Sequence, residues 1–124
     1  TPDRPLDSLA GSKALTTALA RGDRNAIMKL FKKFHEENPA IYSIQWIDEK
    51  GICRFGYPAE NSLQDYDLRT GRSQGDPAML NAVQEKKPAA FEFPLFEGNT
   101  GMFTLRPLFS GERYLGMVYV IVLK

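Results

Sequence analysis

The C-terminal part of the chain reads AAFEFPLFEGNTGMFTLRPLFSGERYLGMVYVIVL over residues 89–123. Apolar and aromatic residues fill three runs, and the short polar segments EGNTG and SGE separate them. Such runs, joined by short loops that contain glycine, predict three antiparallel strands connected by two hairpins. One position is anomalous, because Arg106 lies inside the middle run, immediately before Pro107. Either that run has one wet face, or the arginine points into a cavity that requires a positive charge.

Two more strands precede these runs. Residues 40–47 read AIYSIQWI, the segment DEKG predicts a tight turn, and ICRFGY over residues 52–57 predicts the returning strand. The most apolar strands, residues 40–47 and 113–123, are expected side by side at the centre of the sheet. Numbered along the chain, the five strands then take the spatial order 2-1-5-4-3 in one antiparallel sheet.

Helical patterns fill the N-terminal part of the chain. Residues 6–23 read LDSLAGSKALTTALARGD and predict one helix that ends at Gly22. Residues 24–38 predict a second helix that is capped by Asp23. Its apolar stripe, which must lie on something flat and apolar, consists of Ile27, Leu30, Phe31 and Phe34.

A long segment rich in glycine, proline and polar residues, 58–77, separates the second strand from the third. Loops of this length are uncommon in a compact domain and are usually functional or mobile. The segment ends in a short helix, 77–86, for which Asp76 is the expected N-cap. The sequence therefore predicts a single α+β domain over residues 1–124. Its helical segment, 1–38, covers one face of the sheet formed by residues 40–124, and the loop with its short helix covers the other.

Composition argues against several classes of function. A formal net charge of +1, with Lys and Arg scattered among acidic residues, gives no basis for nucleic-acid binding. Cys53 is the single cysteine and His35 the single histidine, which excludes an internal disulfide, a cysteine metal cluster and a histidine-based triad within this chain. No nucleotide-binding, hydrolase or metalloprotease motif is present. The chain is therefore expected to be no enzyme and to hold neither a metal nor a cofactor.

Several segments resemble one family of sensor domains. A helix precedes the pattern I-x-x-I-x-W-I-D-x-x-G over residues 41–51, and the next strand ends in G-Y-P at 56–58. The pattern G-x-F-x-L-x-P-L-F follows at 101–109, before a hairpin and an apolar final strand. These features resemble the PAS-like extracytoplasmic sensor domains of the PDC or Cache group. The segment DYDLRTGRSQGDPAMLNAVQEKKPA, 65–89, adds a similarity to the CHASE type.

The resemblance implies a function and a location. Such a domain is the ligand-sensing input of a membrane receptor, such as a sensor histidine kinase, a chemoreceptor or a cyclic-dinucleotide enzyme, and it lies in the periplasm or outside the cell. No run of this chain is long and apolar enough to cross a bilayer. Because the chain ends inside an apolar strand, we expect it to be part of a longer protein that is anchored in the membrane. The resemblance also implies a homodimer formed through the N-terminal helices. The alternative is a protein-interaction module on the same fold, without a small ligand.

Three arginines are candidates for binding an anionic or zwitterionic ligand, because guanidinium groups bind carboxylates in a bidentate manner. They are Arg69, Arg72 and Arg106, and the resemblance implies a carboxylate or an amino-acid-like ligand beneath the loop 57–76. The alternative for Arg69 and Arg72 is an ion pair with Asp65, Asp67 or Asp76 that holds the loop shut. The alternative for Arg106 is a packed stem with the charged head in water.

Other candidate ligand-binding residues are aromatic or small and polar. Tyr57 and Tyr66 lie at the loop boundary, where binding residues concentrate, whereas core packing is the alternative for Trp46 and Tyr119 in central strands. Asp67 is a candidate for receiving a ligand amine, with a helix cap or a loop ion pair as the alternative.

Alternation along residues 101–109 separates two faces of the middle strand. Phe103 and Leu105 fall on an apolar face with Pro107 and Phe109, and this face is expected to meet the helix stripe. Thr104 and Arg106 fall on the mixed face, which predicts Arg106 at the floor of a pocket roofed by residues 57–76. Pro107 is awkward in an interior strand, so a bulge or an early end of pairing is expected there.

Overall fold

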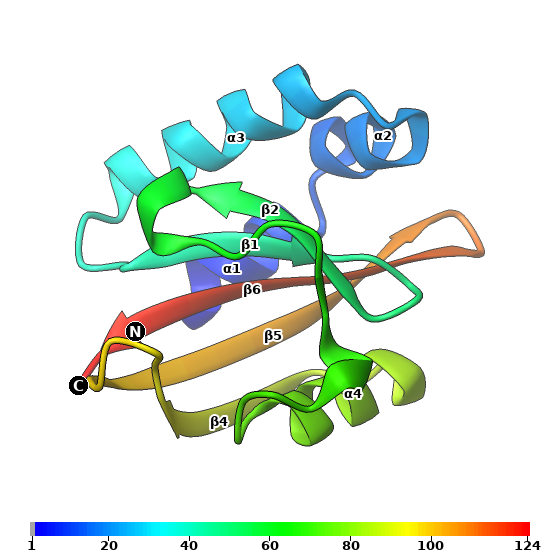
Figure 1. Ribbon diagram of the computed structural model, residues 1–124. Coiled ribbons are helices and arrows are strands. Elements are labelled where there is room, and N and C mark those ends of the chain that lie inside the picture. Colours follow the sequence, from blue (N-terminus) through cyan, green and yellow to red (C-terminus); the bar gives the residue numbers. More distant parts are fainter. Residues whose placement is uncertain (1) are drawn as a thin grey trace.

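A six-stranded antiparallel sheet forms the centre of the molecule in the computed structural model, which describes residues 2–124 (Figure 1). The strand order is β3-β2-β1-β6-β5-β4. The strands are β1 (Ser43–Ile47), β2 (Ile52–Tyr57), β3 (Tyr66–Asp67), β4 (Ala89–Pro94), β5 (Thr100–Ser110) and β6 (Arg113–Leu123). The five expected strands keep their predicted relative order, and β6 pairs with β1. The predicted strand count is wrong, because residues 66 and 67 of the long loop pair with β2 as a short edge strand.

Three short helices, rather than two long ones, precede the sheet: α1 (Asp3–Ala10), α2 (Lys13–Arg21) and α3 (Arg24–Glu37). The single helix predicted over residues 6–23 is broken at Gly11 and Ser12. The Ser12 hydroxyl accepts a hydrogen bond from the backbone N–H of Leu15, which starts α2 in a new direction. The expected stop at Gly22 and the cap at Asp23 are confirmed.

The helices α1, α2 and α3 all pack on one face of the sheet, which we call the helix face. Its core contains Ile44, Phe55, Val118 and Val120 from the strands, together with Leu6, Leu15, Ile27, Phe31 and Phe34 from the helices.

The opposite face, which we call the loop face, carries residues 58–75 and α4 (Asp76–Glu85). Two 3₁₀ turns, η1 (Ala59–Asn61) and η2 (Leu68–Thr70), shape the loop on either side of β3. The sheet is therefore covered on both sides, as predicted. Figure 1 shows the green loop starting next to β2 and running down to α4, which lies at the opposite end of the view from α3.

The predicted faces of β5 are exchanged. Phe103 and Leu105 belong to the core of the loop face with Met117 and Tyr119, not to the core beneath the helices. Their neighbours Thr104 and Arg106 consequently point to the helix face. Alternation separated the two sets correctly, but both faces of this sheet are covered and apolar, so a count of apolar residues did not identify which face meets the helices.

Of the two arrangements expected at Pro107, a bulge or an early end of pairing, the structure shows the second. β4 pairs with β5 only as far as Ala89 opposite Leu105, whereas β6 continues past Pro107. Pro107 therefore lies where β5 has a neighbour on one side only, a position in which a strand tolerates the missing N–H. The ladder is irregular one step later, where Leu108 faces Gly116 and Phe109 faces Tyr114.

Gly116 is required by the close approach of β6 to β1. Its φ of +95° falls in the region that favours glycine, and an added Cβ would lie 1.9 Å from the carbonyl oxygen of Ile47. The glycine thus lets the central strands meet where the ladder changes register.

Candidate functional site

A cavity of about 100 Å³ lies between the loop face of the sheet and the long loop. Its walls come from β1, β5 and β6, from the loop and the start of α4, and from the β4–β5 hairpin. Aromatic and aliphatic side chains make up most of the lining, and a few polar groups converge on it, which is the usual make-up of a small-molecule site. The lining residues are Tyr42, Gln45, Glu60, Asn61, Ser62, Leu63, Leu68, Ser73, Gly75, Asp76, Met79, Phe93, Pro94, Leu95, Phe96, Glu97, Phe103, Tyr119 and Ile121.

Gln45 in β1 fastens the loop to the floor of the cavity. Its side chain is almost fully buried, and its Oε1 accepts hydrogen bonds from the Tyr119 hydroxyl (2.7 Å) and from the backbone N–H of Leu63 (3.0 Å). Its Nε2 donates to the hydroxyl of Ser43 at 2.9 Å. The neighbouring strand makes room for this amide with Gly56, where an added Cβ would lie 2.4 Å from Cγ of Gln45. Both polar atoms of the amide therefore have protein partners, and the side chain anchors the loop.

A second anchor joins the first part of the loop to the segment before β1. Asn61 donates from Nδ2 to the carbonyl oxygen of Tyr42 at 3.0 Å, and both residues line the cavity. The pKa of the Tyr42 hydroxyl is raised, first by burial and then by the carboxylate of Glu97 on the β4–β5 hairpin. The hydroxyl thus stays protonated beside that carboxylate at neutral pH.

Asp76 is the most deeply buried charged group of the site, with 3% of its surface exposed. It was predicted to be the N-cap of the short helix, but Gly75 is the N-cap and Asp76 lies in the first turn of α4. Its Oδ2 accepts a short hydrogen bond from the Tyr66 hydroxyl and another from the backbone N–H of Ser73 at 3.2 Å. Burial, followed by the contact with Asp76, raises the pKa of Tyr66. The N-terminus of α4 favours a negative charge at this position.

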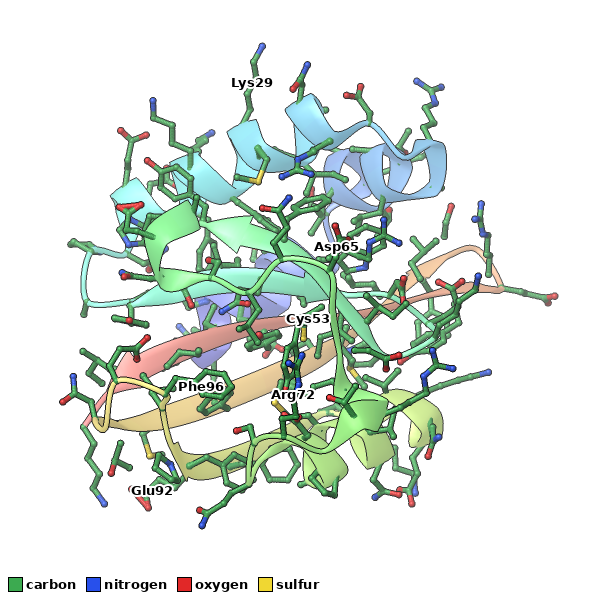
Figure 2. All side chains as sticks on the ribbon, viewed as in Figure 1. Lys29, Cys53, Asp65, Arg72, Glu92 and Phe96 are labelled. Carbon is green, nitrogen blue, oxygen red and sulfur yellow. The ribbon has the colours of Figure 1, made fainter. Side chains whose placement is uncertain are left out.

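The β4–β5 hairpin supplies one wall and an exposed aromatic side chain. Phe96 is 66% exposed, and its ring meets the edge of Tyr66 with 6.3 Å between centroids. The guanidinium of Arg72 lies over the same tyrosine, 5.0 Å from the ring centroid. Figure 2 shows Phe96 and Arg72 on the loop side of the sheet, in front of β5 and β6. Phe96 is therefore a cavity residue that is open to solvent.

Tyr119 and Cys53 form the deepest part of the loop-face core. The Tyr119 hydroxyl lies 3.9 Å from Sγ of Cys53, and the tyrosine ring stacks on Phe103 with 6.0 Å between centroids. Burial raises the pKa of the Cys53 thiol to about 12 and that of Tyr119 well above its ordinary value. Cys53 is thus an inert packing residue, as expected from the sequence.

Of the residues predicted to bind a ligand, Tyr119 lines the cavity. Tyr66 lies behind the lining and donates a hydrogen bond to Asp76, which lines it. Arg72 stacks on Tyr66 without lining the cavity. Arg69 and Asp67 pair with each other at 2.8 Å on the surface, which is the alternative considered for this loop.

The other predicted ligand residues lie on the helix face. Trp46 donates from Nε1 to the carbonyl oxygen of Leu115 at 2.8 Å and packs edge-on against Phe55, and Tyr57 packs on His35 of α3. Thr104 pairs with Val120, a residue of the helix-face core. An irregularity between β1 and β2 explains the position of Tyr57, since Trp46 faces Phe55 but Ile47 faces Cys53, so that Arg54 is an extra residue in β2.

The prediction that Arg106 forms the floor of the pocket is wrong. Its guanidinium binds α1, with Nε 2.6 Å from Oδ1 of Asp7 and Nη2 3.3 Å from Oδ1 of Asp3. The side chain is 19% exposed and also donates to the carbonyl oxygen of Leu105. Its charge is matched by two carboxylates from a segment about a hundred residues earlier, whose position relative to the sheet could not be read from the sequence.

Sequence reasoning missed several residues that shape the cavity: Gln45, Glu60, Asp76 as a lining group, Phe96 and Glu97. Gln45 carried a usable signal, because it is a polar residue at an inward position of a central strand and must find partners there. Glu60 and Glu97 carried none, since each lies in a loop whose course only the fold determines.

A wider depression, of about 330 Å³, lies on the helix layer beside α2 and the start of α3. Its lining contains no aromatic side chain and consists of Lys13, Ala14, Thr17, Ala18, Arg21, Asp23 and Ala26. It is shallow and open to solvent, so it lacks the enclosure that a small-molecule site requires.

The described residues form neither a metal site nor a membrane-spanning helix. Among residues 2–124, no cluster of His, Cys, Asp and Glu side chains is arranged to hold a metal ion. No helix of the described chain has the length and apolar character needed to cross a membrane.

The fold is similar to that of several solved domains from receptor and sensory proteins. An extracellular ligand-binding receptor from Desulfohalobium retbaense matches with a TM-score of 0.72 at 21% sequence identity, over 97% of this chain and 21% of that one. The extracellular domain of a protein assigned as a histidine kinase matches with a TM-score of 0.67 at 11% identity, over 94% of this chain and 47% of that one. A domain assigned to a sensory box/GGDEF-family protein from Vibrio parahaemolyticus gives 0.67 at 12% identity, over 94% and 50%.

The chain thus shares the fold of these receptor and sensory-protein domains, in agreement with the α+β fold predicted from its sequence, and it spans between a fifth and a half of the length of the structures it matches. No protein-family model and no curated protein matches the sequence. At these identities the similarity establishes the fold, and any function has to be argued from the site.

Proposed function

We propose that this chain is the extracytoplasmic ligand-sensing input domain of a signal-transduction receptor, such as a sensor histidine kinase or a chemoreceptor. The observation that supports it is the cavity between the sheet and the loop 57–76, where the sequence predicted a ligand site. Extracellular receptor domains of the same fold add support for the location. The domain itself catalyses no reaction, and a membrane anchor and an output module lie elsewhere in the parent protein.

The wall structure of the cavity offers a route from ligand to signal. Loop and hairpin residues from 60–76 and 93–97 line one side, and the central strands line the other. A ligand that binds the closed arrangement better than the open one shifts the population toward it. Strand β5 carries Phe103 in the cavity wall and, on its other face, Arg106 bound to α1. We propose that β5 links cavity closure to the position of α1, and that the N-terminal helices pass the change to a second copy of the receptor.

The predicted carboxylate ligand lacks support from the lining. None of Arg69, Arg72 and Arg106 lines the cavity, so the groups that motivated an anionic ligand are not where such a ligand would bind. The proposed ligand is therefore a small molecule beneath the loop that these arginines do not bind.

Methyl NMR during titration with a broad panel of small metabolites tests this function. A ligand of the cavity is expected to shift the methyl signals of Leu63, Leu68 and Met79, while Leu15 and Ile27 in the helix-face core provide an internal control. A ligand at a hundred times its dissociation constant adds about 2.7 kcal/mol to the stability of the domain, which corresponds to about 10 °C in Tm at this chain length. If no compound moves either the cavity methyls or Tm, the alternative applies, namely an interaction module with no small ligand.

A further inference from the structure

The cavity is lined by three carboxylates and by no Lys or Arg side chain. Asp76 contributes one from α4, Glu60 one from η1 and Glu97 one from the β4–β5 hairpin. Arg72 lies outside the lining, over the ring of Tyr66. Asp76 is buried, whereas Glu60 and Glu97 are exposed residues at the border of the cavity. An acidic lining of this kind repels an anion and attracts a cation.

A second observation is that one oxygen of Asp76 is free. Both hydrogen bonds that Asp76 accepts, from Tyr66 and Ser73, end on Oδ2. Within residues 2–124, every fully enclosed polar side-chain atom has a hydrogen-bond partner, and Oδ1 of Asp76 takes part in no bond. Oδ1 therefore keeps some accessible surface although 97% of the residue is buried, and the space that Asp76 lines is the cavity. Oδ1 is therefore able to accept a hydrogen bond from a donor that enters the cavity.

The remaining polar groups of the lining do not alter this balance. Gln45 has both of its side-chain polar atoms occupied by protein partners, and the Tyr119 hydroxyl donates to it. The amide nitrogen of Asn61 donates to the backbone carbonyl of Tyr42. The other polar side chains of the lining, Tyr42, Ser62 and Ser73, are hydroxyls that carry no positive charge. The aromatic side chains Phe93, Phe103 and Tyr119 line the same cavity, and aromatic rings add a cation–π attraction for a cation that reaches a ring face.

The volume limits the size of the guest. A cavity of about 100 Å³ holds several water molecules and therefore admits a small organic compound. No set of carboxylates within the described residues is arranged to hold a metal ion, which favours an organic cation over an inorganic one.

We propose that the cavity binds a small organic ammonium ion that carries no carboxylate group, with its N–H groups donating to Oδ1 of Asp76 and its alkyl part packed on the aromatic wall. This inference rests on the proposed ligand-sensing function and specifies its ligand. It differs from the amino-acid-like ligand expected from the sequence, because a ligand carboxylate would have no cationic side chain in the lining and would lie among three anionic ones.

Isothermal or NMR titration with matched probes tests the proposal. The probes are n-propylammonium chloride, ethanolammonium chloride, 1-propanol, sodium propionate and β-alanine, all at neutral pH and constant ionic strength. At least one of the two ammonium ions is expected to bind ten or more times more tightly than 1-propanol and to shift the methyl signals of Leu63, Leu68 and Met79. Propionate and β-alanine are expected to leave these signals unchanged.

Variants assign the effect to the carboxylate. Asp76→Asn is expected to weaken ammonium binding at least tenfold, whereas Glu112→Gln, which removes an equal charge at the distant β5–β6 turn, is expected to leave it unchanged. If Asp76→Asn does not fold, the double variant Glu60→Gln/Glu97→Gln replaces it, and a threefold or greater loss of affinity is expected.

Each remaining outcome has a defined meaning. Tighter binding of propionate, β-alanine or propanol than of both ammonium probes overturns the ligand class but leaves the sensing function standing. Unchanged ammonium affinity in the folded variants overturns the role of the carboxylates. No response of the cavity methyls to these probes or to the metabolite panel overturns the inference and the proposed function together.

Discussion

Replacing Arg106 with Gln separates its structural role from the ligand role predicted by the sequence. In the structure, the guanidinium joins β5 to α1 through Asp7 at 2.6 Å and Asp3 at 3.3 Å. The cavity lies on the other face of the sheet, and Arg106 does not line it. We therefore expect Arg106→Gln to loosen α1 and to retain ligand binding, because the side chain makes no contact with the cavity.

The expected loss of stability is modest because the two acidic partners are largely in water. The side chains of Asp3 and Asp7 are 57% and 59% exposed, and exposed ion pairs are worth about 0.2–1 kcal/mol each. Two such pairs, together with the lost packing of a stem that is mostly buried, give about 1–2 kcal/mol. At 1 M salt, where the screening length falls to about 3 Å, the ionic part of this difference should shrink.

Urea denaturation at low and high salt measures the loss, and hydrogen exchange locates it. Amides of α1 should exchange faster in Arg106→Gln, while those of β1 and β6 should not. A double-mutant cycle with Asp7→Asn should give a coupling of about 0.5–1 kcal/mol. Arg4→Gln is the matched control, since Arg4 belongs to the same helix and no ion pair of this residue is found within the described chain. An Arg106→Gln protein that retains full stability and loses ligand binding would refute the structural role.

Three other perturbations follow from the geometry. Gly116→Ala should destabilise the domain by at least about 3 kcal/mol in urea denaturation. Gly98 has the same φ of +95° but open space around it, so Gly98→Ala should cost only about 1 kcal/mol of backbone strain. Equal losses in the two variants would refute the close approach of Gly116 to Ile47. Tyr66→Phe removes a donor to buried Asp76 and should cost about 1–3 kcal/mol in the same assay, and an unchanged midpoint would refute this hydrogen bond. The pKa of Cys53 is about 12 in the folded state and near 8.5 in the unfolded state. The stability that the thiol contributes is therefore complete below about pH 8.5 and is lost as pH rises toward 12, by up to about 1.4 kcal/mol per pH unit. Cys53→Ala should flatten this part of the curve of unfolding free energy against pH, and an unaltered curve would refute the assignment.

Much of the fold was predictable because each strand signals itself locally. Apolar runs bounded by glycine and polar residues identified the five long strands, and the apolar character of residues 40–47 and 113–123 placed them together at the centre, as observed. Strand β3 escaped notice, since two residues give no periodicity to read. The break between α1 and α2 was missed because the apolar spacing continues across Gly11, and only the capping hydrogen bond of Ser12 interrupts it.

The location of the candidate site was more predictable than its residues. Length and composition alone directed attention to residues 57–76, and the cavity lies beneath that segment. Its polar residues come from several elements whose mutual placement depends on the whole fold, so no local pattern could bring Asp76, Glu60 and Glu97 together. Arginine was favoured as the recognition group from its chemistry, but in the structure each candidate arginine has a partner within the protein.

The failure at Arg106 comes from a property of sheets that are covered on both sides. Alternation assigns residues to two sets, but it does not say which set meets the helices when both sets are apolar enough to be buried. Two irregularities make the two sets of residues harder to assign to faces. The extra residue Arg54 puts Cys53 and Phe55 on opposite faces of the sheet, and the register shift at Gly116 puts Leu115 and Met117 on opposite faces. A charged residue in such a strand is better located by asking which carboxylates can reach it. Here the answer is α1, and the anionic ligand that Arg106 was expected to bind is replaced by two aspartates of the protein's own first helix.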